Sequence, residues 1–172
     1  MLKKIWFIGI ILAIASSVCH AEYKAYDIDG KYRAVFGGVP IYEAELGAGS
    51  GKHRSYSYTD ENSLIIYTAT YQIGKTNFTN ATLAKAIKNY VHGQSLAVGG
   101  SVLSYMQKTI NGNQSAIFEI QYKMQGVIIN KYAVVSYKNG HFYQWAIQEL
   151  PVHSKLDGNH IFNTHLKSFL VH

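Results

Sequence analysis

Histidine is the residue through which this chain could most readily bind a metal ion. His153 and Asp157 are four residues apart, so one turn of a helix would place both side chains on the same face. His160 follows nearby, and imidazole together with carboxylate is a common ligand set for zinc and other transition metals. The spacing matches no defined zinc motif. The three residues are therefore either a divalent-metal site or histidines scattered near the end of the chain.

Other patterns that carry catalysis are missing. The sequence has no His-Glu-x-x-His, Gly-x-Ser-x-Gly or Ser-x-x-Lys motif. The glycine-rich stretch at residues 47–52 is similar to a phosphate-binding loop, but His53 stands where that loop requires Ser or Thr. We therefore predict no catalytic residue, and we interpret this stretch as a surface loop.

Aromatic side chains give a second candidate, a surface that binds another molecule. Several Tyr and Trp residues fall in segments that alternate as β-strands do, and exposed Tyr and Trp are enriched at protein interfaces. The residues predicted for this surface are Tyr56, Tyr58, Tyr143 and Trp145, with Lys52 and His53 at the neighbouring loop. The alternative is that helices cover both faces of the sheet, which would make the aromatic residues part of the core.

The first 21 residues are predicted to be a signal peptide that is removed on export. Lys3 and Lys4 precede an uncharged apolar run at residues 5–15, and Ala21 with Cys19 suits a cleavage site. An uncleaved anchor is the alternative, but the apolar run is shorter than a bilayer requires. A lipoprotein cut before Cys19 is a further alternative, although the preceding residues match the lipoprotein pattern poorly.

The remaining chain, residues 22–172, is predicted to form one domain that works in the periplasm or outside the cell, without a membrane span. Loss of Lys3 and Lys4 leaves 14 basic and 10 acidic residues, a formal net charge of +4. The basic residues form no cluster, so we expect no binding to nucleic acid. Cys19 is the only cysteine, so the domain must rely on a hydrophobic core rather than on disulfides.

Hydrophobic periodicity predicts seven strands and two helices. Strands are expected at residues 31–36, 53–59, 64–73, 102–110, 115–124, 127–138 and 141–149. Between the third and the fourth, apolar residues recur at helical spacing and predict a helix over 81–98 with Asn80 as its N-cap. A second helix is expected over 154–168.

Two Asn-Gly pairs favour tight hairpin turns, at residues 111–112 and 139–140, because Asn and Gly tolerate positive φ. The last four strands should therefore form an antiparallel meander. The order of strands, helix, four strands and helix predicts an α+β domain. We expect a twisted antiparallel sheet of six to seven strands with two helices packed on it, in an α/β/α-like sandwich.

Five segments resemble those of the PsbP-like family, whose fold is shared with a nuclear-transport factor that binds the GTPase Ran. They are residues 32–40, 67–73, 108–112, 141–145 and 162–171. The first segment departs from the family pattern, because Gly37-Gly38 stands where Pro-Gly is commoner. The resemblance covers nearly the whole mature chain and implies the family's α+β fold. It also implies a non-catalytic role in binding or assembly, with no catalytic residue to transfer.

Three hypotheses for function follow. The first is an exported, non-enzymatic binding or accessory protein that recognises a protein partner or a small ligand. The second is a metal-dependent hydrolase that uses the histidines near the C-terminus. The third is a secreted effector, which the sequence does not separate from a periplasmic protein.

Overall fold

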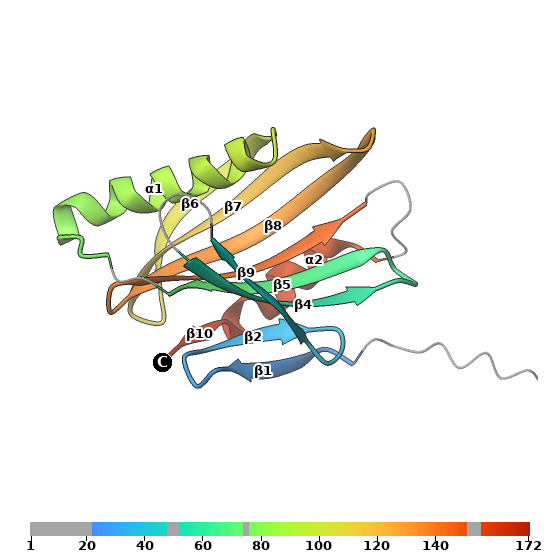
Figure 1. The fold of residues 1–172 in the computed structure, drawn as a ribbon, viewed down its shortest axis with the longest axis horizontal. Coiled ribbons are helices and arrows are strands. Elements are labelled where there is room, and N and C mark those ends of the chain that lie inside the picture. The colour runs from blue at the N-terminus through green and yellow to red at the C-terminus, as the bar shows by residue number, and fades with distance from the viewer. Residues whose placement is uncertain (1–21, 48–51, 74–75, 151–155) are drawn as a thin grey trace, which may run out of the picture.

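A computed structural model describes residues 22–47, 52–73, 76–150 and 156–172, and the predicted signal peptide lies outside them. The chain forms two antiparallel sheets and two α-helices (Figure 1). In chain order the elements are β1 (Lys24–Ile28), β2 (Tyr32–Phe36), β3 (Ile41–Gly47), β4 (Lys52–Asp60), β5 (Ile65–Gln72), α1 (Asn80–Ala97), β6 (Ser101–Ile110), β7 (Asn113–Met124), β8 (Val127–Lys138), β9 (His141–Glu149), α2 (Gly158–His165), the 3₁₀ helix η1 (Leu166–Ser168) and β10 (Leu170–Val171).

The larger sheet has seven strands in the order β3-β4-β5-β9-β8-β7-β6. Its second half is the predicted meander of β6 to β9. The two Asn-Gly turns are confirmed, because Asn111, Gly112, Asn139 and Gly140 all have positive φ. The return of β9 to the middle of the sheet places β6 at its far edge.

Helix α1 packs on one face of this sheet (Figure 1). Its predicted apolar stripe is confirmed, because Leu83, Ile87 and Val91 are buried against Phe118 and Ile120 of β7. The helix begins one residue earlier than predicted. Its N-cap is Thr79, whose backbone N–H donates to the Oγ1 atom of Thr82 at 3.0 Å. Together the stripe and the cap fix α1 over β7, beside the edge strand β6.

The other face of the large sheet is covered by α2 and by the small sheet, whose order is β1-β2-β10 (Figure 1). Trp145 of β9 lies at the centre of this core, where its ring stacks on Phe162 of α2 at 5.2 Å between centroids. Its indole N–H donates to the carbonyl oxygen of Val35 in β2 at 2.8 Å. One side chain thus joins the large sheet to both elements that cover it.

The predicted α+β class is confirmed, with differences at the edges. Strands β1, β3 and β10 were not predicted, because they are short or lie beside glycine-rich stretches. The C-terminal helix is shorter than the predicted 154–168, because the chain tightens into η1 and then extends to pair with β2. The main feature that the sequence did not predict is the small sheet, which covers one face of the large sheet together with α2.

Within the described part of the chain, no helix has both the length and the apolar character needed to cross a bilayer.

Lys131 of β8 is a charged group under α1, and its removal should stabilise the fold. Its Nζ atom donates to the Oε1 atom of Gln94 at 2.8 Å, and burial lowers the pKa of Lys131 from 10.5 to about 8. Between pH 8 and pH 10.5 the Lys131 side chain binds fewer protons in the folded state than in the unfolded state, so the free energy of unfolding rises with pH. Lys131 is partly buried, and below pH 8 the cost of desolvating its ammonium group is fully present.

We expect Lys131→Met to raise the free energy of unfolding by about 1–3 kcal/mol at pH 7, and by less at pH 9.5. Denaturant unfolding at both pH values measures this difference. Lys85→Met, at an exposed position of α1, is the matched control and should change little. An equal effect of Lys131→Met at both pH values would show that lost charge is not the cause.

Candidate functional site

Strand β6 presents a long, exposed edge. Eight of its ten residues are exposed, and among the described strands it pairs with β7 alone. Its other side therefore carries a row of backbone N–H and C=O groups that faces no described strand. Such an edge is a template on which a further strand can pair.

The pairing with β7 shows which side chains of β6 face α1. Residues directly opposite one another in an antiparallel pair share a face. Tyr105 lies opposite Phe118 and Gln107 opposite Ala116, and both β7 residues belong to the core under α1. The register shifts between Val102 and Ser104, which places a β-bulge at Leu103. Tyr105 and Gln107 thus form a wall opposite α1.

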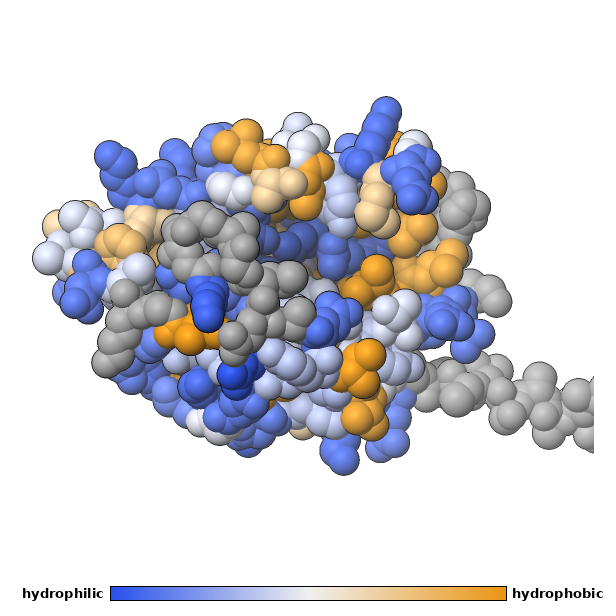
Figure 2. Space-filling model, in the orientation of Figure 1, coloured by the Kyte–Doolittle hydropathy of each residue, from blue (hydrophilic) through white to orange (hydrophobic). Residues whose placement is uncertain are grey.

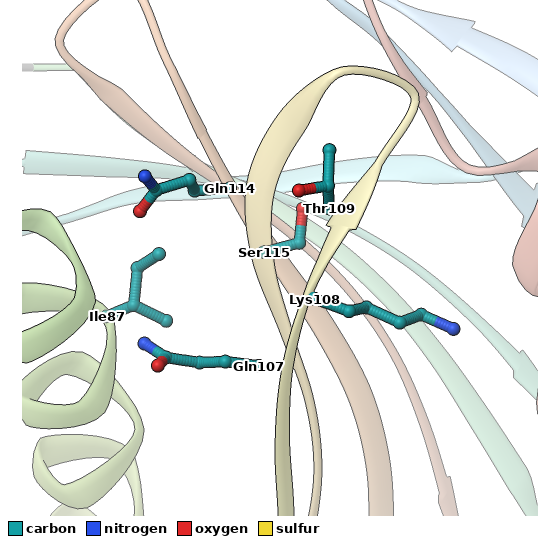
Figure 3. A pocket seen from close by; sticks show the side chains of 6 residues that line it. All are labelled: Ile87, Gln107, Lys108, Thr109, Gln114 and Ser115. Atoms are coloured by element: carbon teal, nitrogen blue, oxygen red, sulfur yellow. The ribbon is translucent and has the colours of Figure 1, made fainter. Parts of the chain in front are cut away.

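Two hollows lie between α1 and the β6–β7 hairpin, and together we call them the α1–β6 groove. The smaller has a volume of about 210 Å³ and is lined by Ile87, Gln107, Lys108, Thr109, Gln114 and Ser115. Figure 3 shows Gln107 and Gln114 reaching towards the helix, whereas Lys108 points to the opposite side of the hairpin. The Nε2 atom of Gln107 donates to the carbonyl oxygen of Ala84 at 2.7 Å, so this polar contact ties β6 to α1.

The larger hollow combines an apolar floor with a polar rim. Its volume is about 530 Å³, and it is lined by Lys88, Asn89, Val91, His92, Val102 and Tyr105. The hydroxyl of Tyr105 is buried and has no hydrogen-bond partner among the described residues, and burial raises its pKa. The hydroxyl therefore stays protonated at neutral pH and remains able to donate. Apolar lining with a few polar groups is typical of binding sites.

Apolar side chains are exposed along the same region. Five of the ten large apolar side chains that are exposed in the described residues belong to the end of α1 and to β6: Leu96, Val98, Val102, Leu103 and Met106. Figure 2 shows hydrophobic surface over the C-terminal half of α1, at the top of the view. A concentrated apolar surface of this kind often marks a binding site.

The charge of this region has one sign. No Asp or Glu occurs between Glu61 and Glu119, whereas Lys85, Lys88 and Lys108 fall within that interval. The interval contains all of α1 and β6. The absence of carboxylates from this interval can be read from the sequence alone. It is the one sequence signal that could have indicated this face, which was not predicted.

The predicted aromatic surface is not assembled in the structure. Trp145 and Tyr143 are buried, because the small sheet and α2 cover the face of the sheet on which they lie. Tyr58 is partly buried and lies against Gly38, where an added Cβ would come within 2.3 Å of its ring. For these three residues the alternative of a covered, core position holds.

Tyr56 is half-buried and belongs to a polar cluster around Asp29 in the turn between β1 and β2. The hydroxyls of Tyr56 and Tyr71 donate to the Asp29 carboxylate at 2.7 and 2.9 Å. The Nη1 atom of Arg54 donates to the same carboxylate at 3.2 Å. These bonds fasten the small sheet to β4 and β5, so the role that the structure gives Tyr56 is that of a clamp between sheets. Lys52 is exposed at the start of β4, beside the partly buried His53.

The carboxylate of Asp29 gives a prediction about acid stability. Burial opposes its ionisation, but hydrogen bonds from Tyr56, Tyr71 and Arg54 outweigh burial and hold the pKa of Asp29 below its ordinary value of 3.8. A lowered carboxyl pKa contributes stability that is present above pH 3.8 and is lost as pH falls through the folded-state value.

We expect Asp29→Asn to lower the free energy of unfolding by about 0.5–1 kcal/mol at pH 7, since the cluster is partly solvated. Asn also tolerates the positive φ of 54° at this position, so the substitution removes the charge without introducing backbone strain. Denaturant unfolding should show the difference between the two proteins shrinking towards pH 3. A difference that persists unchanged at pH 3 would contradict the proposed role of the ionised carboxylate.

The predicted metal ligands are only partly described. His153 lies outside the described residues. Asp157 is the N-cap of α2 and accepts the backbone N–H of His160 at 3.0 Å, while His160 itself is exposed. In the described ranges, no three His, Cys, Asp or Glu side chains lie where they could share a metal ion. The metal site remains a prediction.

The comparisons with known proteins address the fold. No protein-family model matches the chain, and no curated protein sequence does. The solution structure of cyanobacterial PsbP (CyanoP) from Synechocystis sp. PCC 6803 is similar, with a TM-score of 0.62 and 12% identity over 94% of this chain and 99% of that one. A protein of unknown function and putative regulator from Pseudomonas aeruginosa aligns with a TM-score of 0.48 and 7% identity, over 84% and 88% of the two chains. The likeness to PsbP supports the PsbP-like fold that the sequence suggested.

Proposed function

We propose that this chain is an exported, non-enzymatic binding protein that recognises a partner protein by pairing one strand of the partner with β6. The observation that carries the proposal is the exposed ten-residue edge of β6 beside a groove with an apolar floor. Main-chain hydrogen bonds along such an edge give affinity, and pockets for alternate side chains give specificity. The α1–β6 groove supplies pockets of this kind on one face of the added strand.

The other edge of the large sheet is a weaker candidate. Strand β3 has seven residues, and its register with β4 shifts between Tyr42 and Ala44. A bulge of this kind bends an edge and interrupts its pairing early in the strand. In β6 the bulge also falls at the third residue, but the strand is longer. A regular run from Ser104 to Ile110 remains for a partner, whereas in β3 only Ala44 to Gly47 remains. The edge at β3 therefore serves as the internal control.

A photo-crosslinking amino acid at Met106, in cells that export the protein, tests the proposal. We expect one discrete protein adduct from Met106 and none from the exposed Asn159 of α2. Thr109→Asp, at an exposed position within the regular run of β6, should reduce the adduct about tenfold, because aspartate is disfavoured in strands and a charge on an edge opposes pairing. The matched control Ile41→Asp, at the β3 edge, should leave it unchanged.

The partner identified in this way is then added to the purified chain, and hydrogen–deuterium exchange is measured. Protection of β6 amides, with β3 amides unaffected, is the expected result. Equal adducts from Met106 and Asn159 would overturn the proposal. It would also be overturned if the β6 amides exchanged at the same rate with and without the partner.

A further inference from the structure

We propose that the segment that pairs with β6 is an extended strand in which acidic and apolar side chains are mixed. This inference rests on the proposed function and specifies the chemistry of the partner. Three observations support it. They are the charged residues around β6, the shape of the α1–β6 groove, and the charge repulsion that a second copy of the chain would experience at this edge.

Lysines flank the β6 edge on both faces of the sheet. Lys88 lies at the rim of the larger hollow, and Lys108 points to the face away from α1. Neither α1 nor β6 contains a carboxylate. Glu119 of β7 lies on the face away from α1, opposite Ser104 of β6 on one side and Tyr132 of β8 on the other. A strand that enters here therefore meets Lys88 on the α1 face, where α1 and β6 supply no acidic side chain to neutralise it. On the other face it meets Lys108, which shares that face with Glu119.

The alternation of a strand divides the side chains of the partner between these two faces. A strand added to β6 would lie about 4.8 Å from it, with successive side chains pointing to opposite faces. Those directed at α1 enter the larger hollow, where Val102 and Tyr105 form the floor and Lys88 the rim. An apolar side chain fits the floor, and a carboxylate two residues further along the strand, on the same face, fits the rim. The free hydroxyl of Tyr105 can donate to a carboxylate or a carbonyl oxygen.

A second copy of this chain is a poorer occupant of the same edge. Antiparallel pairing of β6 with β6 would add a second Lys88 and a second Lys108 along the shared edge, and neither copy offers a carboxylate from α1 or β6. Positive charge gathered at one edge without a balancing carboxylate disfavours the association. The charge of this face thus favours a different, acidic chain over self-association.

Two fluorescent decapeptides test the inference on the purified mature chain. One repeats the unit Val-Val-Glu-Glu, so that each face of the strand carries both valine and glutamate, and its twin has lysine in place of glutamate. We expect the glutamate peptide to bind at least about tenfold more tightly in fluorescence anisotropy, with an affinity that falls as salt is raised. Lys88→Glu and Lys108→Glu should each weaken it, while Lys167→Glu, at an exposed position of η1, should not.

Hydrogen–deuterium exchange at β6 separates this inference from the proposed function. Equal protection of β6 by both peptides would overturn the acidic partner and leave strand addition standing. No protection by either peptide would overturn both. A stable dimer in sedimentation, with β6 protected in the absence of peptide, would show that a second copy is the occupant and would also overturn the inference.

Discussion

Trp145→Ala is expected to lower the free energy of unfolding by about 3–5 kcal/mol, a large part of the total for a domain of this size. The side chain has no exposed surface, stacks on Phe162 of α2 and donates to the carbonyl oxygen of Val35. Its truncation opens a cavity between the two sheets and α2, and it leaves a buried carbonyl without its donor. Chemical denaturation followed by circular dichroism measures the change.

Two further variants separate packing from the hydrogen bond. Trp145→Phe keeps a ring against Phe162 but removes the indole donor, so it should cost about 1–3 kcal/mol. Met106→Ala, on the exposed edge strand, should stay within about 0.5 kcal/mol of the parent. A cost for Trp145→Ala no larger than that for Met106→Ala would show that this tryptophan is not the junction described above.

The sequence predicts the parts of the fold in which local and tertiary preferences agree. The turns at Asn111-Gly112 and Asn139-Gly140 are set by the tolerance of those residues for positive φ, so the meander from β6 to β9 could be predicted from the chain alone. Strands β8 and β9 begin and end where the alternation predicted. Strand β10 has two residues and forms only because β2 is beside it, which no local pattern can show.

The candidate site could be predicted far less well, and the reason is physical. Alternation shows that Trp145 points to one face of the sheet, but it does not show what covers that face. The prediction of an exposed aromatic surface failed for Tyr143 and Trp145 because the small sheet and α2 bury them, whereas Tyr56 and Tyr58 are partly buried. The β6 edge was overlooked because edge position depends on strand order, which follows from the return of β9 to β5.

Glu149→Ala should lower the free energy of unfolding by about 2–4 kcal/mol. Glu149 is buried at the end of β9, where it accepts the hydroxyl of Tyr132 at 2.8 Å and the backbone N–H of Gly158 at 2.6 Å. Its removal leaves two buried donors without an acceptor. Glu149→Gln should cost about 1 kcal/mol or less, because the amide oxygen can accept from Gly158 while the amide N–H donates to the Tyr132 oxygen.

A double-mutant cycle with Gly158→Ala tests whether the carboxylate and the start of α2 act as one unit. A Cβ at Gly158 would lie 2.6 Å from the Oε2 atom of Glu149, so the single variant should displace the carboxylate and destabilise the fold. In the Glu149→Ala background the same methyl group meets the space that the carboxylate has left, and its cost should fall by about 1 kcal/mol or more. Additive costs for the two substitutions would show that helix α2 is positioned without this contact.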